Sequence, residues 1–296
     1  MASSIVIKEG KTLHDFEINK KVKTNQKISK MILLIINILV VGIVLFPLIY
    51  AVLMSLKDPS EIYMGNATLL PKQLKFSNYV EVFRVAPIGR YILNSFIVAV
   101  SITFFQIIFA SFASFSFHFF QFKGKGILFS LVMATMMVPG EATIISNYLQ
   151  VSGWGWLDSY PVLIIPYMTS AMGIFLFRQS YKSFPMELYE SAKIDGCSNF
   201  KFIFKILLPL SKPAIGAQAV ASFISAWNMY MWPLLVTGDD KYRTVQIGMG
   251  MLNSVDSQSM VLMLSGVVIC MLPSLTIFIF GQKNMIKGLI SGAVKG

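Results

Sequence analysis

Charged residues are scarce in this chain. They make up 13% of its 296 residues, whereas 55% of the residues are hydrophobic. A soluble domain of this size carries about twice that share of charge. The composition therefore excludes an ordinary soluble protein and predicts a membrane protein. The net charge of +11 does not indicate nucleic acid as a partner, because basic loops orient membrane proteins.

The residue types that most often carry catalysis or bind metals are nearly missing. The chain has two histidines, His14 and His118, and two cysteines, Cys197 and Cys270. That leaves almost no material for a histidine-based triad or a zinc site. No GxxxxGK[ST] phosphate loop occurs either. We therefore expect no enzymatic activity, no metal and no cofactor in this chain, and any ATP it depends on must be hydrolysed by another polypeptide.

Long apolar runs are what the chain has in quantity. They cover about 31–56, 91–117, 127–150, 161–178, 213–236 and 259–281. A membrane helix needs about 20 apolar residues, and only the fourth run is a little short. The predicted fold class is an all-α integral membrane protein with six transmembrane helices. The first run is too long for a signal-peptide core, so it predicts a retained anchor.

The positively charged residues are distributed unevenly between the loops. Eighteen of the 25 Lys and Arg residues lie before the first run, in the 118–126 and 178–212 loops, and after the last run. The positive-inside rule places these segments in the cytoplasm. We expect a cytoplasmic tail over residues 1–28, a membrane domain over 29–281 and a second cytoplasmic tail over 282–296, in contact with membrane lipid throughout the domain.

One polar segment interrupts the apolar runs between Pro185 and Pro213. It predicts two short helices joined by an Asp-Gly turn. Pro185 suits a first helical position, and Gly196 can adopt the left-handed conformation that ends a helix. A second helical run begins after Ser198 and stops at Pro209.

This segment resembles the EAA loop of ABC importer permeases. The matching residues are Glu190, Ser191, Ala192, Asp195, Gly196, Leu208 and Pro209. Other stretches are similar to maltose-type sugar permeases, so the resemblance covers nearly the whole chain: NSFIVAV, VPGEATIISNYL, SAWNMYMWPLL and GQKNMIKGLISGAVKG. Ser191 and Cys197 stand where the family usually has Ala, and both are small enough to preserve the loop.

The resemblance implies a function and a set of partners. It implies a permease subunit of a binding-protein-dependent ABC importer in a bacterial cell membrane, with a coupling helix in residues 182–212 that docks on a cytoplasmic ATPase. The implied partners are a second permease subunit, a dimer of ATPase subunits that bind the ATP and Mg, and an extracytoplasmic solute-binding protein. The residues implied in coupling are Glu190, Ser191, Ala192, Asp195, Gly196 and Pro209.

Candidate residues for the solute pathway lie in two apolar runs. Glu141 stands about 14 residues into the third run, which is ~21 Å along a straight helix. A carboxylate there must face water or be paired, so it either lines the pathway or forms a structural hydrogen bond. In the fifth run, Trp227, Asn228, Tyr230 and Trp232 combine aromatic faces with an amide. Such groups hold sugars, but the same pattern can serve helix packing and a kink at Pro233.

The substrate class follows from the same features. The motifs indicate a carbohydrate importer, although WGWLDSYPVLIIP, FLFRQ and YRTVQIGMGML also resemble glycerol-3-phosphate permeases. Because charges are rare in the apolar runs, we expect a neutral mono- or oligosaccharide, with glycerol-3-phosphate as the alternative, since a dianion needs Arg or Lys at close range. A stand-alone secondary carrier is the alternative of a different class. It would need intramembrane ionisable groups, of which Glu141 is nearly the only one.

Overall fold

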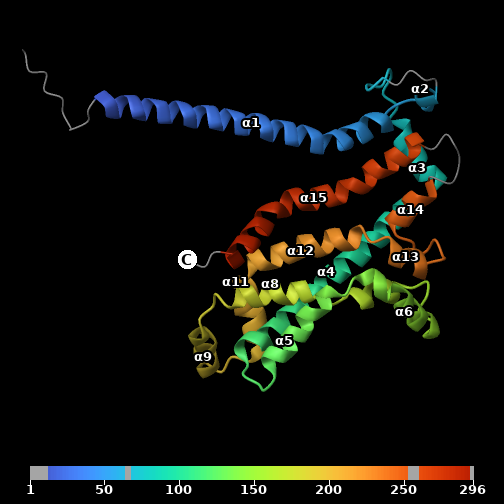
Figure 1. Cartoon of the computed structure of the whole chain (residues 1–296). Coiled ribbons are helices and arrows are strands. Elements are labelled where there is room, and N and C mark those ends of the chain that lie inside the picture. Colours follow the sequence, from blue (N-terminus) through green and yellow to red (C-terminus); the bar gives the residue numbers. More distant parts are fainter. Residues whose placement is uncertain (1–12, 64–67, 253–259, 294–296) are drawn as a thin grey trace, which may run out of the picture.

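The computed structural model describes residues 13–63, 68–252 and 260–293, and every regular element within them is a helix (Figure 1). This confirms the predicted all-α membrane fold. Within these ranges, three helices are long and apolar enough to cross a membrane without a break. They are α1 (Leu13–Ser55), α4 (Ile88–Phe119) and α15 (Met260–Ala293).

Three further crossings are bent pairs of helices. The segment formed by α5 (Lys125–Ala134) and the 3₁₀ turn Thr135–Met137 meets α6 (Gly140–Gly153) at 95°. α7 (Tyr160–Ile164), with the 3₁₀ turn Ile165–Tyr167, meets α8 (Ala171–Tyr181) at 46°. The segment Asn199–Leu210 meets α12 (Lys212–Trp227) at 83°. The described chain therefore has three continuous spans, or six crossings when each bent pair counts as one.

Besides the fourth run, which the 46° bend between α7 and α8 divides, two predicted runs are divided where straight helices were expected. The third run breaks before Pro139 and the fifth ends as a helix at Trp227, after which α13 (Met231–Val236) begins. Proline disfavours a helical conformation in the residue before it, which accounts for the first break. The second break precedes Pro233 by several residues, so the kink that we expected at Pro233 itself is displaced to Asn228–Tyr230.

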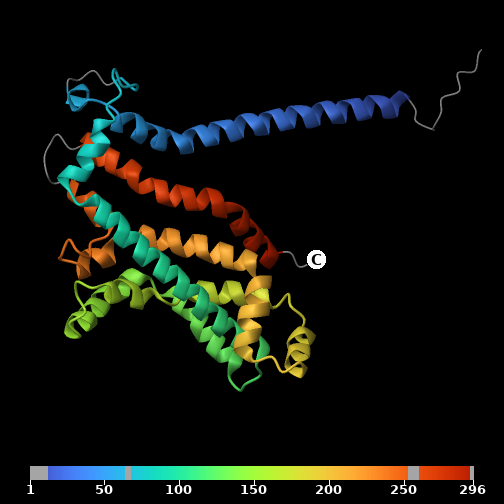
Figure 2. The same cartoon turned by 180° about the vertical axis from the view of Figure 1, so that it is seen from behind.

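The short helices cap the ends of the long ones. At one end, called the outer end after the orientation predicted from charge, lie α2 (Pro59–Tyr63), α3 (Ser77–Val85), α13 and α14 (Val245–Leu252), and at the other end lies α9 (Met186–Ile194) (Figures 1 and 2). Helices α4, α8, α12 and α15 form the body between them, with α12 against both α4 and α15. Both terminal helices exceed the predicted membrane spans, since α1 starts at Leu13 and α15 continues to Ala293.

Helix α1 stands apart from this body. It contacts α15 near its own C-terminal end and then projects away from the other helices (Figures 1 and 2). None of the residues in its 18-residue apolar window is buried. The apolar surface of α1 is therefore open to lipid or to another membrane subunit.

The body has two apolar cores, one toward each end. The outer core includes Ile102 and Phe223, and the inner core includes Ala110 and Leu207. Between them lies a hydrogen-bonded trio from α4 and α12, in which Ser222 donates to Gln106 Oε1 at 2.6 Å and Gln218 Nε2 contacts the same oxygen at 3.1 Å. Gln106 Nε2 in turn donates to the Tyr167 carbonyl at 2.8 Å. The trio thus joins the two cores to the bend between α7 and α8.

The closest approach of α12 and α15 generates the first testable prediction. A Cβ added at Gly281 would lie 2.1 Å from Val220 Cγ2. Gly281→Ala should therefore destabilise the protein by about 1–3 kcal/mol, as overpacking does. Adding Val220→Ala should restore most of the loss, because it removes the clashing methyl group. The melting temperature of the purified chain measures both effects.

A matched glycine distinguishes this clash from a general effect of alanine. Gly126 lies in helix α5 and an added Cβ there meets no atom within 4 Å. Gly126→Ala should leave the melting temperature unchanged or raise it slightly, because alanine is the better helix former. Equal melting temperatures for Gly281→Ala and the wild type would contradict the close packing of α12 on α15.

Candidate functional site

The predicted coupling segment forms a helical hairpin, hereafter the α9 hairpin, residues 185–210. Pro185 has an extended conformation (φ −66°, ψ 146°) and is the N-cap of α9. The helix therefore begins at Met186, one residue later than expected. Gly196 has φ +72°, which is the left-handed conformation that its sequence context indicated. Cys197 N donates to the Ala192 carbonyl at 2.8 Å, and Gly196 N to the Lys193 carbonyl at 3.0 Å. These two bonds make a Schellman motif, so the turn that follows α9 is fully hydrogen-bonded.

The second half of the hairpin continues further than predicted. Ser198 Oγ accepts from Lys201 N at 3.3 Å and caps α10 (Asn199–Phe202). A π-helix over Ile203–Leu207 follows, and then α11 (Leu208–Leu210), so the helical path passes Pro209. Proline in a helix clashes with the carbonyl four residues earlier, and the wider π turn relieves that clash. The expected stop at Pro209 therefore becomes a distortion, and the chain turns at Ser211 instead.

One face of the hairpin is fixed to the end of α4 by aromatic side chains. The Tyr189 ring lies 5.0 Å from Phe119 and 5.1 Å from Phe202, measured between ring centroids. Its hydroxyl donates to Asn199 Oδ1 at 2.8 Å, which joins the two halves of the hairpin. Ala192 is buried beside this cluster. Such packing holds α9 in a set orientation relative to the membrane helices.

The opposite face of the hairpin is exposed. It presents four of the predicted coupling residues, Glu190, Ser191, Asp195 and Gly196, and Pro209 is also exposed. Ile194 is 86% exposed, which is unusual for an isoleucine. Ile194 was not predicted as a contact residue, although its position directly before the Asp-Gly turn places it at the tip.

The two tryptophans of the predicted solute pathway are buried. Trp227 is 1% and Trp232 is 2% exposed. Trp227 Nε1 donates to the Cys270 carbonyl at 3.1 Å, and Trp232 Nε1 to the Val162 carbonyl at 2.9 Å. Both indoles therefore fasten α12 and α13 to neighbouring helices, which is the packing alternative that the sequence had left open.

The other two residues of that segment are exposed at the break between α12 and α13. Asn228 and Tyr230 both face the surface, and Tyr230 is 42% exposed. Gln246 on α14 donates to Asn228 Oδ1 at 3.2 Å. We call Asn228, Tyr230 and Gln246 the amide–tyrosine group. Gln246 was missed from sequence, because nothing in the α14 sequence indicates that this helix lies beside the break.

Glu141 lies in a different place from the one expected. It stands in the first turn of α6, directly after the 95° bend at Pro139, so it is not ~21 Å along a straight helix. Its side chain is exposed and forms no hydrogen bond or ion pair with the described residues. The bend thus removes the buried position that made a structural hydrogen bond necessary.

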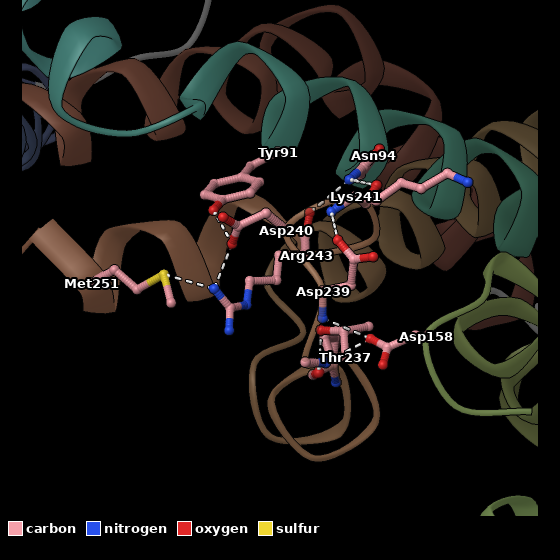
Figure 3. A network of polar contacts seen from close by, with 11 residues as sticks. Tyr91, Asn94, Asp158, Thr237, Asp239, Asp240, Lys241, Arg243 and Met251 are labelled. Carbon is pink, nitrogen blue, oxygen red and sulfur yellow. Dashed lines mark hydrogen bonds and ion pairs between the residues drawn. The ribbon is translucent and has the colours of Figure 1, made fainter.

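The outer end carries a polar network that the sequence did not reveal (Figure 3). Asn94 Nδ2 donates to the carbonyls of Lys241 and Arg243 at 2.9 and 2.8 Å, and Tyr160 donates to Asn94 Oδ1 at 2.7 Å. Asp158 Oδ1 accepts from the backbone N–H groups of Gly238 and Asp239 at 2.6 and 2.8 Å. The loop 237–244 is therefore held from both sides.

An ion pair completes this network. Arg243 pairs with Asp240, whose Oδ1 also accepts from the Tyr91 hydroxyl at 2.8 Å. Figure 3 shows these side chains between α4 and the loop. The arrangement gives the outer end a rigid polar surface.

Comparison with known proteins identifies the family. Residues 106–290 match the family described as binding-protein-dependent transport system inner membrane component. The chain belongs to this family. It is accordingly a permease component of an ABC importer. The matched region includes the α9 hairpin, the bend before α12 and the amide–tyrosine group.

The chain aligns with two relatives over most of the length of each. The chain is 36% identical to the arabinooligosaccharides transport system permease protein AraQ of Bacillus subtilis, covering 85% of this chain and 91% of that protein. It is also 36% identical to the sn-glycerol-3-phosphate transport system permease protein UgpE of Brucella suis, covering 89% and 96%.

Solved structures give the same fold. A crystal structure of a bacterial ABC transporter involved in the import of the acidic polysaccharide alginate aligns with a TM-score of 0.75 at 22% identity, covering 86% of this chain and 97% of that one. A second structure, in complex with an alginate pentasaccharide-bound periplasmic protein, aligns with a TM-score of 0.58 at 17% identity, covering 86% and 94%. These similarities show the fold of the permease.

The outer polar network generates a prediction about stability. Asn94→Leu keeps the volume but removes the partner of two carbonyls and one hydroxyl. Leaving such groups unpaired should cost about 1–3 kcal/mol. We expect a lower melting temperature and faster proteolysis at 237–244. Asn147→Leu is the control, because Asn147 is exposed on α6. An equal fall in melting temperature in the two variants would contradict the role of Asn94 in holding the loop 237–244.

Proposed function

We propose that this permease imports a neutral sugar or oligosaccharide and that the α9 hairpin receives movement from ATPase subunits. The observation that carries the proposal is the two-sided hairpin. One face packs on α4 through Tyr189, and the opposite, exposed face presents Glu190, Asp195 and Ile194. A helix presented in this way suits docking into a groove of a partner, with Ile194 as an apolar contact and the carboxylates as polar contacts.

The roles of the coupling residues follow from their positions. Glu190, Ser191 and Asp195 would contact the ATPase directly, since they are exposed. Ala192 would act indirectly, because it is buried and lets α9 approach its support closely. Gly196 and Pro209 would set the backbone path. ATP and Mg would be bound and ATP hydrolysed on the separate ATPase subunits, so this chain would catalyse no covalent step.

Other partners complete the proposed importer. A second permease subunit would pack on the open apolar surface of α1, which has no buried residue in its apolar window. An extracytoplasmic binding protein would deliver solute to the outer end, where the loop 237–244 forms a rigid surface. The uneven distribution of Lys and Arg supports a cytoplasmic location for both termini and the α9 hairpin. Membership in the family leaves the stand-alone secondary carrier without support.

The amide–tyrosine group supports a neutral solute. An amide and an aromatic ring offer hydrogen bonds to hydroxyl groups and a face for the sugar ring. Asn228, Tyr230 and Gln246 are uncharged, whereas a phosphate would be held by Arg or Lys. Glu141, exposed beside the bend before α6, would add a carboxylate that favours hydroxyls over anions. Glycerol-3-phosphate remains the second candidate, because a permease for that solute is as similar in sequence as one for arabinooligosaccharides.

The coupling role predicts the effect of changes at Gly196. Gly196→Val should distort the turn, because a β-branched residue resists positive φ. Gly196→Asn should be tolerated, because asparagine adopts the left-handed conformation more readily. We expect Val to abolish uptake and ATPase co-purification while the binding protein keeps its affinity for solute. Normal ATPase docking and uptake in the Val variant would refute the coupling role.

The solute class predicts a pattern of uptake in proteoliposomes that contain the complete importer. Asn228→Ala and Tyr230→Ala should each raise the KM for a neutral oligosaccharide about tenfold, the equivalent of one lost hydrogen bond or ring contact. Trp232→Phe is the control and should lower the melting temperature with little effect on KM, since the ring is buried. Competition by glycerol-3-phosphate in the absence of competition by any neutral sugar would reverse the assignment.

A further inference from the structure

Two cationic side chains and an imidazole meet at the inner end of the body, where α4 ends, α5 begins and α8 ends. They are Lys125, Arg178 and His118, and Lys182 adds a further positive charge close by. Coulombic repulsion reaches the His118 ring from Lys125, Arg178 and Lys182 together. Among the described residues no carboxylate contributes to this field at His118 or Lys125. Lys125 and Arg178 therefore concentrate positive charge and form no ion pair with the residues that the structure describes.

Arg178 is the most constrained member. Its Cζ atom lies 3.9 Å from the centroid of the Phe129 ring, so the guanidinium stacks on α5. Its Nε atom is buried and has no hydrogen-bond partner. Arg178 takes part in none of the ion pairs of the described chain. A partly buried guanidinium in this state lacks the anion that normally accompanies it.

The other two members leave further hydrogen-bonding capacity. Lys125 Nζ donates to the carbonyls of Phe120 and His118 at 2.7 and 3.3 Å. An ammonium group has three protons, so one remains for a ligand. The His118 ring bonds the backbone of Phe184 through one nitrogen, while Nε2 is buried without a partner.

Apolar surface continues directly from the cluster along α5. No residue of α5 is buried, and Ile127, Leu128 and Leu131 are 71%, 48% and 60% exposed. Leu131 lies six residues after Lys125, which corresponds to ~9 Å along the helix. A ligand that fits both features has an anionic head and apolar chains. Inorganic phosphate would use only the cations, and a carboxylate of a soluble partner would leave the exposed leucines unoccupied.

We propose that Lys125 and Arg178 bind the phosphodiester headgroup of an anionic phospholipid whose acyl chains lie against α5, with the His118 ring beside them. The assignment to the inner leaflet rests on the proposed orientation of the α9 hairpin. Basic groups between membrane helices at the cytoplasmic face bind such headgroups. Because Lys125 and Arg178 connect the start of α5 to the ends of α4 and α8, the lipid would also fasten α5 to the support of the α9 hairpin.

The test is native mass spectrometry of the purified complex titrated with phosphatidylglycerol or phosphatidylcholine. The wild type should retain phosphatidylglycerol at least several-fold more tightly. Arg178→Gln and Lys125→Gln should each weaken its retention about tenfold, as expected for one charge-assisted hydrogen bond. Lys205→Gln is the control, because Lys205 is an exposed cation at the same end, and it should retain the lipid as the wild type does.

Four outcomes would overturn the proposal. Equal retention of the two lipids by the wild type would do so without any variant. Unchanged retention in both Gln variants, provided that they are monodisperse on size exclusion, would do the same. Displacement of phosphatidylglycerol by millimolar inorganic phosphate would assign the cluster to a free anion. Loss of ATPase co-purification with normal lipid retention would assign it to the ATPase contact.

Discussion

Peptide carbonyls that lose their helical partners impose the main constraint on this structure. In the hydrocarbon region of a membrane no water can satisfy them, so each break in a helix must be met by a donor from elsewhere in the protein. Three of the crossings are bent. At the bend between α7 and α8 the donors are side chains distant in sequence, since Gln106 bonds the Tyr167 carbonyl and Trp232 the Val162 carbonyl.

The same rule determines how the ends of the long helices are closed. Asn78 Nδ2 donates to the Ser55 and Lys57 carbonyls at 2.9 and 2.8 Å, and Ser265 Oγ also donates to the Ser55 carbonyl. Thus the end of α1 is fixed by α3 and α15, although the rest of α1 touches little. Asn94 plays the corresponding part for the loop 237–244. Amide side chains thus satisfy the irregular backbone at the end of α1 and in the loop 237–244.

This constraint explains which features the sequence predicted and which it did not. The length of the apolar runs predicted the membrane class, and the Asp-Gly turn predicted the left-handed conformation of Gly196. Both features depend on residues close together in the chain. The prediction that the third run forms one straight helix was wrong, since the length of an apolar run does not reveal the 95° bend after Met137. The buried positions of Trp227 and Trp232 were also beyond reach, because their carbonyl partners lie 43 and 70 residues away.

Helix α12 is the physical connection between the two proposed sites. It begins at Lys212, directly after the α9 hairpin, and ends at Trp227, directly before Asn228. Its 16 residues span about 24 Å. A helix held by hydrogen bonds along one side moves as a unit with its neighbour, and Gln218 and Ser222 tie α12 to Gln106 on α4. A displacement of the hairpin under the proposed coupling would therefore reach the amide–tyrosine group through a rigid element, without any need for a flexible relay between them.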